Sequence, residues 1–300
     1  MSKWPVWAVA GTLLLTACSS GEEYKLPVFT IGTSNQTVAA IPVVKSFCEM
    51  LGTPSPCKIA PPDNPVRQLE GVHGGALQLG IVRADALHRA WNGQAPFKTS
   101  LKKLRLLFAL NDEAITLVVS GKAGISSFQQ INGKRINVGQ EGSDNELLVM
   151  DVMKACKAVS SNVVLGRQEP PELPHALLSR TLDGYLEILN HPNLALAQAA
   201  MTARLEILPI EGDCVAAAVK AHPYFDTTAI PGQMYRDTDQ DVATVGVKTW
   251  VVANNDLDEE MVRQLVRKVF NNLEPLRQSN PALHRLSPRK MLKPIDIPYH

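Results

Sequence analysis

The run Leu77-Gln78-Leu79-Gly80-Ile81-Val82 leads directly into Arg83-Ala84-Asp85. A short apolar run of this kind, bounded by polar residues, predicts a compact buried strand. The charged residues that follow it predict a loop that opens onto the next helix. One buried strand followed by a polar loop is the repeating unit of an α/β fold, and the rest of the chain repeats this pattern.

On both sides of this run, predicted strands alternate with segments whose apolar residues recur at helical spacing. The predicted strands span residues 28–32, 57–60, 77–82, 104–110, 114–119, 134–139, 184–189, 206–210 and 245–253. Predicted helices cover residues 41–51, 64–71, 125–132, 149–156 and 256–273, the last with Asp256 and Glu259 as a capping box. This alternation favours an α/β architecture with largely parallel sheets, and no internal repeat is visible.

Composition excludes several classes of protein. The chain has 300 residues, 45% hydrophobic and 20% charged, which is enough for two modest cores. Its net charge of +1 does not favour a nucleic-acid surface. No segment after the N-terminus offers the roughly 18 consecutive apolar residues of a membrane-spanning helix, which excludes a polytopic membrane protein.

The N-terminus predicts export. Residues 1–17 have a short positive start at Lys3 and an apolar run too short to span a bilayer, as in a signal peptide. Leu15-Thr16-Ala17-Cys18 resembles the bacterial lipobox, so we expect cleavage before Cys18 and its acylation. Residues 18–26 then form a tether, and Ser19 favours the outer membrane. An ordinary signal peptide is the alternative.

Four cysteines remain after Cys18. In an oxidising compartment we expect them to pair, and three pairings are possible. Cys48 and Cys57 are the short-loop option, joining a helix end to the next strand, which leaves Cys156 and Cys214 for each other. Neither a CxxC motif nor a Cys/His ligand spacing occurs, so we predict no metal site.

Four loops at predicted strand ends are candidates for a binding site, because ligands of open α/β sheets bind at the carboxyl ends of strands. Helix N-termini there also favour anions. The candidate residues are Ser34, Asn35, Gln36 and Thr37; Asp63 and Asn64; Arg83 and Asp85; and Gly142, Ser143, Asp144 and Asn145.

Each loop also has a structural interpretation. Ser143-x-x-Glu146 is a capping box, and it is as good a helix start as it is an anion site. Arg83 could offer two hydrogen bonds to a ligand carboxylate, or it could pair with Asp85.

Enzyme signatures are absent: the chain has no GxSxG, Walker A or GxGxxG motif. His191 lacks an evident nucleophile partner, and a turn-stabilising role is the better interpretation. The alternating Asp237, Asp239 and Asp241 lack the glycine and distal glutamate of a calcium loop. We therefore predict neither an enzyme nor a cofactor.

Several segments together resemble the TAXI family of solute-binding proteins, which serve TRAP-type (tripartite, ATP-independent) transporters. The matching segments are residues 77–85, 91–93, 124–139, 142–143, 191–193, 222–225, 230–235 and 245–247. The resemblance extends over residues 28–300, and the order and spacing of the segments carry it.

The resemblance implies a two-lobed periplasmic binding protein, class II-like, with a hinge of two crossing segments near residues 111–115 and 241–246. Lobe 1 would comprise residues 27–113 and 246–300, and lobe 2 residues 114–245. The lobes would close on a small solute, such as an amino acid or another organic acid. Asn190 and His191 join the candidate ligand-binding residues on this basis.

This sequence departs from the family in three ligand-facing loops. Ala40 and Ile41 replace a Tyr-Tyr pair, residues 61–65 replace a Ser/Thr/Gly-rich loop, and Arg83 replaces a glutamine. The extra guanidinium predicts a carboxylate-bearing ligand held between Arg83 and the backbone N–H groups near Ser143.

Two functions follow. The first is a lipid-anchored receptor for a small organic anion or amino acid, glutamate- or glutamine-like, that delivers it to a TRAP-type membrane permease. The alternative is a repurposed scaffold that acts as an interaction or sensory lipoprotein without transport.

Overall fold

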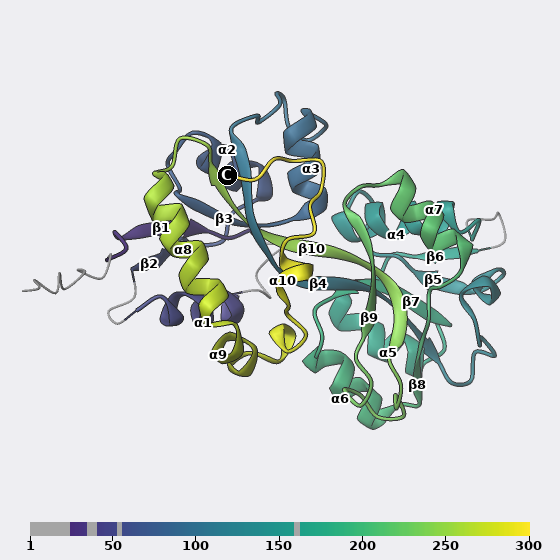
Figure 1. Cartoon of the computed structure of the whole chain (residues 1–300). Helices are drawn as coiled ribbons and strands as arrows, with labels where there is room; N and C mark the ends of the chain where they lie inside the picture. The colour runs from purple at the N-terminus through teal and green to yellow at the C-terminus, as the bar shows by residue number, and fades with distance from the viewer. Residues whose placement is uncertain (1–24, 35–40, 53–55, 159–162) are drawn as a thin grey trace, which may run out of the picture.

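The computed structural model describes residues 25–34, 41–52, 56–158 and 163–300. Two lobes lie side by side, joined by the long strands β4 (Leu104–Ser120) and β10 (Val242–Asn254) (Figure 1). The predicted α/β, two-lobed architecture with two crossing segments is confirmed.

All ten strands of the described residues belong to one sheet, with the order β2-β1-β3-β10-β4-β7-β5-β6, while β8 pairs with β4 and β9 with β10. The remaining strands are β1 (Phe29–Gly32), β2 (Cys57–Ile59), β3 (Leu79–Arg83), β5 (Arg135–Asn137), β6 (Val164–Gly166), β7 (Gly184–Leu189), β8 (Leu205–Leu208) and β9 (Phe225–Ile230). Pairing is parallel among β1, β2 and β3 and among β5, β6 and β7. It is antiparallel wherever β4 or β10 takes part, because the chain crosses out on one and returns on the other.

Helices cover the sheet in both lobes. In the first lobe they are α1 (Ile41–Met50), α2 (Pro65–His73), α3 (Ala84–Asn92), α8 (Glu259–Asn271), α9 (Leu273–Ser279) and the short α10 (Pro288–Met291) near the hinge (Figure 1). The second lobe has α4 (Asp144–Ala155), α5 (Leu173–Leu178), α6 (Leu194–Thr202) and α7 (Asp213–Ala221). Single 3-10 turns occur at Phe128–Ile131, Pro170–Glu172 and Pro281–Leu283. No helix of the described residues is long and apolar enough to cross a membrane.

The run that begins at Leu77 forms β3, whose five residues are all buried. Its apolar side chains enter two different cores. Val82 packs with the cluster beneath α2 and α3, and Ile81 with the cluster beneath α1, α8 and α9. A strand with both faces covered has no solvent-facing side, which is why its apolar run is continuous rather than alternating.

Several sequence predictions differ from the structure. The sheet is not largely parallel, because the two longest strands, β4 and β10, pair antiparallel with all their neighbours. The helix predicted over residues 125–132 is only the 3-10 turn Phe128–Ile131. Residues 104–110 and 114–119, predicted as two strands, form the single strand β4, because the polar residues between them pair with β10. Helix α8 begins after Asp258, whose carboxylate accepts the Met261 N–H at 2.7 Å. Asp256 instead pairs with Lys103 at 2.7 Å, so the proposed cap was two residues too early.

Both cysteine pairs form disulfides. Cys48 at the end of α1 joins Cys57 at the start of β2, with 5.5 Å between the Cα atoms, in the pairing that the short loop predicts. Cys156 at the end of α4 joins Cys214 in the first turn of α7, with 4.5 Å between the Cα atoms. One bridge therefore lies in each lobe.

Candidate functional site

The carboxyl ends of β1 and β3 in one lobe, and of β5 and β7 in the other, converge on the hinge strands (Figure 1). Ser34, just after β1, is fully buried and forms an isolated parallel bridge with Asp63. The loop after β1 and the loop at residues 61–65, two of the four predicted binding loops, therefore lie side by side. Asn35, Gln36 and Thr37 lie outside the described residues.

Arg83 is not open to a ligand in this structure. Its Nε lies 2.6 Å from one oxygen of Asp85 and its Nη2 lies 3.0 Å from the other, a bidentate pair. Arg83 is 5% exposed and Asp85 is 0% exposed. Burial opposes charge on both groups, yet the mutual attraction outweighs it, raising the pKa of Arg83 and lowering the pKa of Asp85. Of the two roles considered for Arg83, ligand contact or ion pair with Asp85, the structure shows the ion pair.

A chain of polar side chains leads from this pair into the other lobe. The buried Glu113 of β4 lies 3.8 Å from Arg83 and accepts hydrogen bonds from the Thr249 hydroxyl, at 3.1 Å, and from Asn190. Burial raises the pKa of Glu113. Since the Asn190 amide nitrogen is used there, its Oδ1 accepts from Asn111 Nδ2. Asn111 Oδ1 is left buried without a partner.

His191 stabilises the turn after β7. Its Nε2 lies 2.9 Å from the Thr116 hydroxyl, which itself donates to Ala114 O, so Nε2 carries the proton. Its Nδ1 then accepts from the Tyr235 hydroxyl at 2.6 Å, and that oxygen in turn accepts the Asn193 N–H. Burial lowers the pKa of His191 to about 4, so the ring is neutral at pH 7.

The polar groups of the loop before α4 also make mainly structural hydrogen bonds within the protein. Ser143 Oγ accepts the Glu146 N–H at 3.1 Å, while the Glu146 carboxylate accepts from Gly142 N at 2.6 Å. Gly142 has φ of +76°, a conformation that favours glycine. The Asn145 amide donates to Val138 O and Leu186 O and accepts from Ile188 N, so it fastens α4 to β7 instead of facing a ligand.

Asn64 and Asp144, predicted from different loops, line one cavity of about 160 Å³. Arg89 of α3 lines it too and lies 3.6 Å from Asp144, so this ion pair joins the two lobes. Asn64 Oδ1 accepts the Arg67 N–H at 2.9 Å and caps α2, and Asp63 accepts the Asn64 N–H at 2.7 Å.

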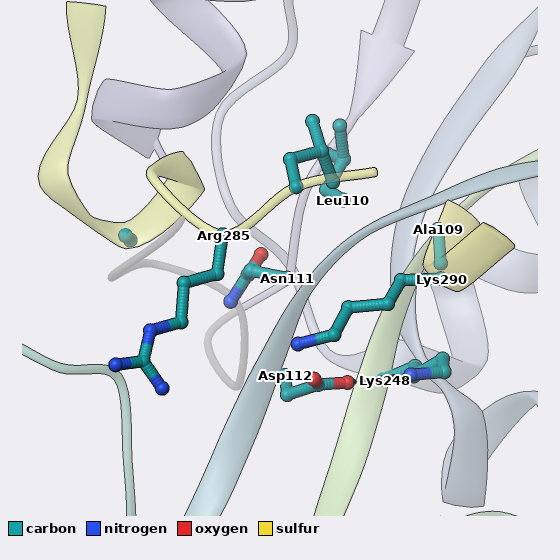
Figure 2. A pocket seen from close by; sticks show the side chains of 9 residues that line it. Ala109, Leu110, Asn111, Asp112, Lys248, Arg285 and Lys290 are labelled. Atoms are coloured by element: carbon teal, nitrogen blue, oxygen red, sulfur yellow. Dashed lines mark hydrogen bonds and ion pairs between the residues drawn. The ribbon is translucent and has the colours of Figure 1, made fainter. Parts of the chain in front are cut away.

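A second group of cavities adjoins the hinge, and the sequence analysis did not anticipate it. Figure 2 shows one of them, a cavity of about 50 Å³ in which the side chains of Asn111, Arg285 and Lys290 gather around the hinge strand β4. A neighbouring cavity of about 60 Å³ extends to His191. The sequence signal for these cavities was Lys248, the one charged residue of β10.

Two α/β lobes joined by crossing strands, with polar side chains of both lobes buried at the hinge, define a solute-binding protein fold of the periplasmic type. Residues 31–300 match the NMT1-like family, and the chain belongs to it. The fold and family are those of substrate-binding proteins, which are generally not enzymes. Within the described residues, no group of three or more His, Cys, Asp or Glu side chains could hold a metal ion.

Solved structures show the same fold at low sequence identity. PhnD1 from Prochlorococcus marinus (MIT 9301), in complex with methylphosphonate, is 14% identical with a TM-score of 0.53, covering 89% of this chain and 93% of that one. Substrate-binding domain 2 of GlnP from Lactococcus lactis, in an open conformation, is 9% identical with a TM-score of 0.52, covering 88% and 96%. XAC2383 from Xanthomonas citri, bound to ATP, is 10% identical with a TM-score of 0.51, covering 87% and 92%.

Proposed function

We propose that this chain is a lipid-anchored receptor of the TAXI type, which binds a small organic anion or amino acid outside the cytoplasm and delivers it to a TRAP-type permease. The observation that carries the binding role is the polar cluster at the hinge. In this cluster Arg83 and Glu113 lie beside Asn190 of the other lobe. At its end, the buried Asn111 Oδ1 has no hydrogen-bond partner. A buried unsatisfied acceptor costs about 1–3 kcal/mol, and a ligand that donates to it removes that cost.

Hinge closure on the solute would move the two lobes about the strands β4 and β10. We propose residues 27–113 and 246–300 as lobe 1 and residues 114–245 as lobe 2. The proposed boundaries fall where β4 changes partners, because Ala114 pairs with both Gly246 of β10 and Leu189 of β7. A change of partner within a continuous strand allows bending without breaking the chain.

A screen of the purified mature chain against amino acids and organic acids tests the receptor function. A true ligand at about 100 times its Kd is expected to stabilise the protein by about 2.7 kcal/mol, seen as a rise of several degrees in Tm. If no amino or organic acid raises the Tm, the receptor function is refuted.

The second candidate function is a repurposed scaffold that acts through an envelope partner as an interaction or sensory lipoprotein. The observation that favours it is the Arg83–Asp85 pair, which neutralises the one cation that the altered loops introduce. A silent solute screen together with recovery of a bound envelope protein would support this function.

The lipid anchor is proposed from the lipobox alone. Cys18→Ser is expected to abolish labelling by a fatty-acid analogue and to release the protein from membranes, since acyl chains contribute about 0.8 kcal/mol per buried CH₂. Sucrose-gradient fractionation would then test the outer membrane as the site of the acylated form. A Cys18→Ser variant that still partitions fully into membranes would contradict the anchor.

A further inference from the structure

The cavity of about 160 Å³ lies where the two lobes meet, between α2 and α3 of the first lobe and the start of α4 of the second (Figure 1). Most of the residues that line it are apolar: Pro65, Val66, Ala86, Pro96 and Phe97. Ala86 and Phe97 are only 4% and 5% exposed, so this part of the wall belongs to the packed interior of the first lobe. A wall of this composition favours an apolar occupant.

The charges beside this cavity are already balanced. Arg89 lies 3.6 Å from Asp144 and 3.6 Å from Asp85. Asp85 also makes the bidentate contact with Arg83. Two guanidinium groups therefore face two carboxylates. A charged ligand group placed here would lose its water without gaining a free countercharge, and an incoming carboxylate would compete with Asp144 for Arg89.

The volume limits the size of the group that fits. An apolar cavity of about 150 Å³ accommodates a benzene molecule, so the present cavity can hold a ring or a branched chain of about four to six carbons. The Phe97 ring in the wall adds a surface on which a second ring can pack. Alanine-sized groups leave most of this space unfilled.

We infer that this interlobe cavity receives the apolar side chain of the bound solute, so that the substrate class is an amino acid or organic anion with a branched aliphatic or aromatic side chain. This inference rests on the proposed receptor function and names its substrate class. The cavity contains Asn64 and Asp144 from two of the predicted binding loops, and because Asp144 comes from the second lobe, the cavity is complete only while the lobes are together. A glutamate or glutamine side chain fits less well, since its polar end would be desolvated without a free partner.

Calorimetry with two matched series of probes tests this class. The amino acids are L-alanine, L-leucine, L-phenylalanine and L-glutamate, and the organic acids that correspond to them are propanoate, 4-methylpentanoate, 3-phenylpropanoate and glutarate. In at least one series, the leucine-sized or the phenylalanine-sized member is expected to bind about 10- to 100-fold tighter than the alanine-sized member, because its side chain leaves water. Equal affinities across a series that binds, or tightest binding of the glutamate-sized member, would overturn the inference.

Variants that fill the cavity assign the contact. Val66→Phe fills it from the half-buried first turn of α2 and Ala86→Leu fills it from α3. Each is expected to weaken the tightest probe by about tenfold while the alanine-sized member is little affected. Val164→Phe is the matched control, because Val164 is exposed on β6 and does not line the cavity. Unchanged affinity of the tightest probe in Val66→Phe would refute the site even if Ala86→Leu failed to fold.

Failure of this inference can be distinguished from failure of the receptor function. If the broad screen finds a solute whose affinity Val66→Phe and Ala86→Leu leave unchanged, the interlobe cavity is not its site and the receptor stands. If no solute binds, the receptor function and this inference fall together.

Discussion

Asp85→Ala is expected to lower the free energy of unfolding by about 3–5 kcal/mol, the range for removing one partner of a buried ion pair. Asp85 is fully buried and makes a bidentate contact with Arg83, whose guanidinium is itself 5% exposed. Without the carboxylate, the guanidinium stays in the interior, and Glu113 is a remaining carboxyl group 3.8 Å away. That contact is too long to replace two direct hydrogen bonds.

Urea denaturation of the Asp85→Ala variant measures this loss. Asp144→Ala is the matched control, because that carboxylate is 37% exposed and lies 3.6 Å from Arg89, so its loss is expected to cost no more than about 1 kcal/mol. Replacing both partners, Arg83→Met with Asp85→Leu, is expected to recover most of the stability, since no charge is then left buried. A cost below about 1 kcal/mol for Asp85→Ala would show that the pair does not hold this strand end.

The Arg83–Asp85 ion pair also affects how the ligand affinity of an Arg83→Ala variant is interpreted. As a ligand contact, Arg83 would contribute about 1.5–3 kcal/mol to binding of a carboxylate. In this structure its removal instead leaves Asp85 buried and without its main partner, so the variant loses stability before any ligand is added. Affinity in that variant is informative only when its unfolding curve is measured beside it.

Much of the fold could be predicted because local patterns specify it. The run from Leu77 becomes a strand because five consecutive residues are buried, and Ser143 starts α4 because its hydroxyl accepts an N–H that the helix leaves unpaired. Residues 111–113 were harder to interpret. They separate two apolar runs, so the sequence predicted two strands, but in the structure they pair with β10 in the middle of the hinge, where the resemblance placed a crossing segment.

The site was less predictable, because its contacts join residues that are far apart in the chain. The sequence identifies the loops at strand ends, but not that Asn111 meets Asn190, 79 residues away. Arg285 and Lys290 belong to a polar C-terminal segment with no local pattern, and only the folding of that segment against β4 makes them cavity residues. Arg83 was difficult for the opposite reason, because its partner is close in the chain. Asp85, two residues away, competes directly with any ligand for the guanidinium.

Removing the Cys156–Cys214 disulfide is expected to cost about 4 kcal/mol of unfolding free energy, more than removing Cys48–Cys57. The two bridges close loops of very different length, with sequence separations of 58 and 9 residues. In the chain-entropy model the longer loop constrains the unfolded chain more, which gives about 4 kcal/mol against about 2–3 kcal/mol. In the folded state, α4 and α7 also contact each other through Val149, Val152 and Val215, which share one apolar cluster.

Urea denaturation of two paired variants tests the ordering: Cys156→Ala with Cys214→Ala, and Cys48→Ala with Cys57→Ala. Replacing both cysteines of each pair leaves no free thiol to form a wrong bridge, and the pairs serve as controls for each other. Peptide mapping of the parent chain without reduction should recover both linked pairs. A larger loss from the Cys48–Cys57 pair would mean that native-state contacts, rather than the entropy of the unfolded chain, dominate the effect of these bridges.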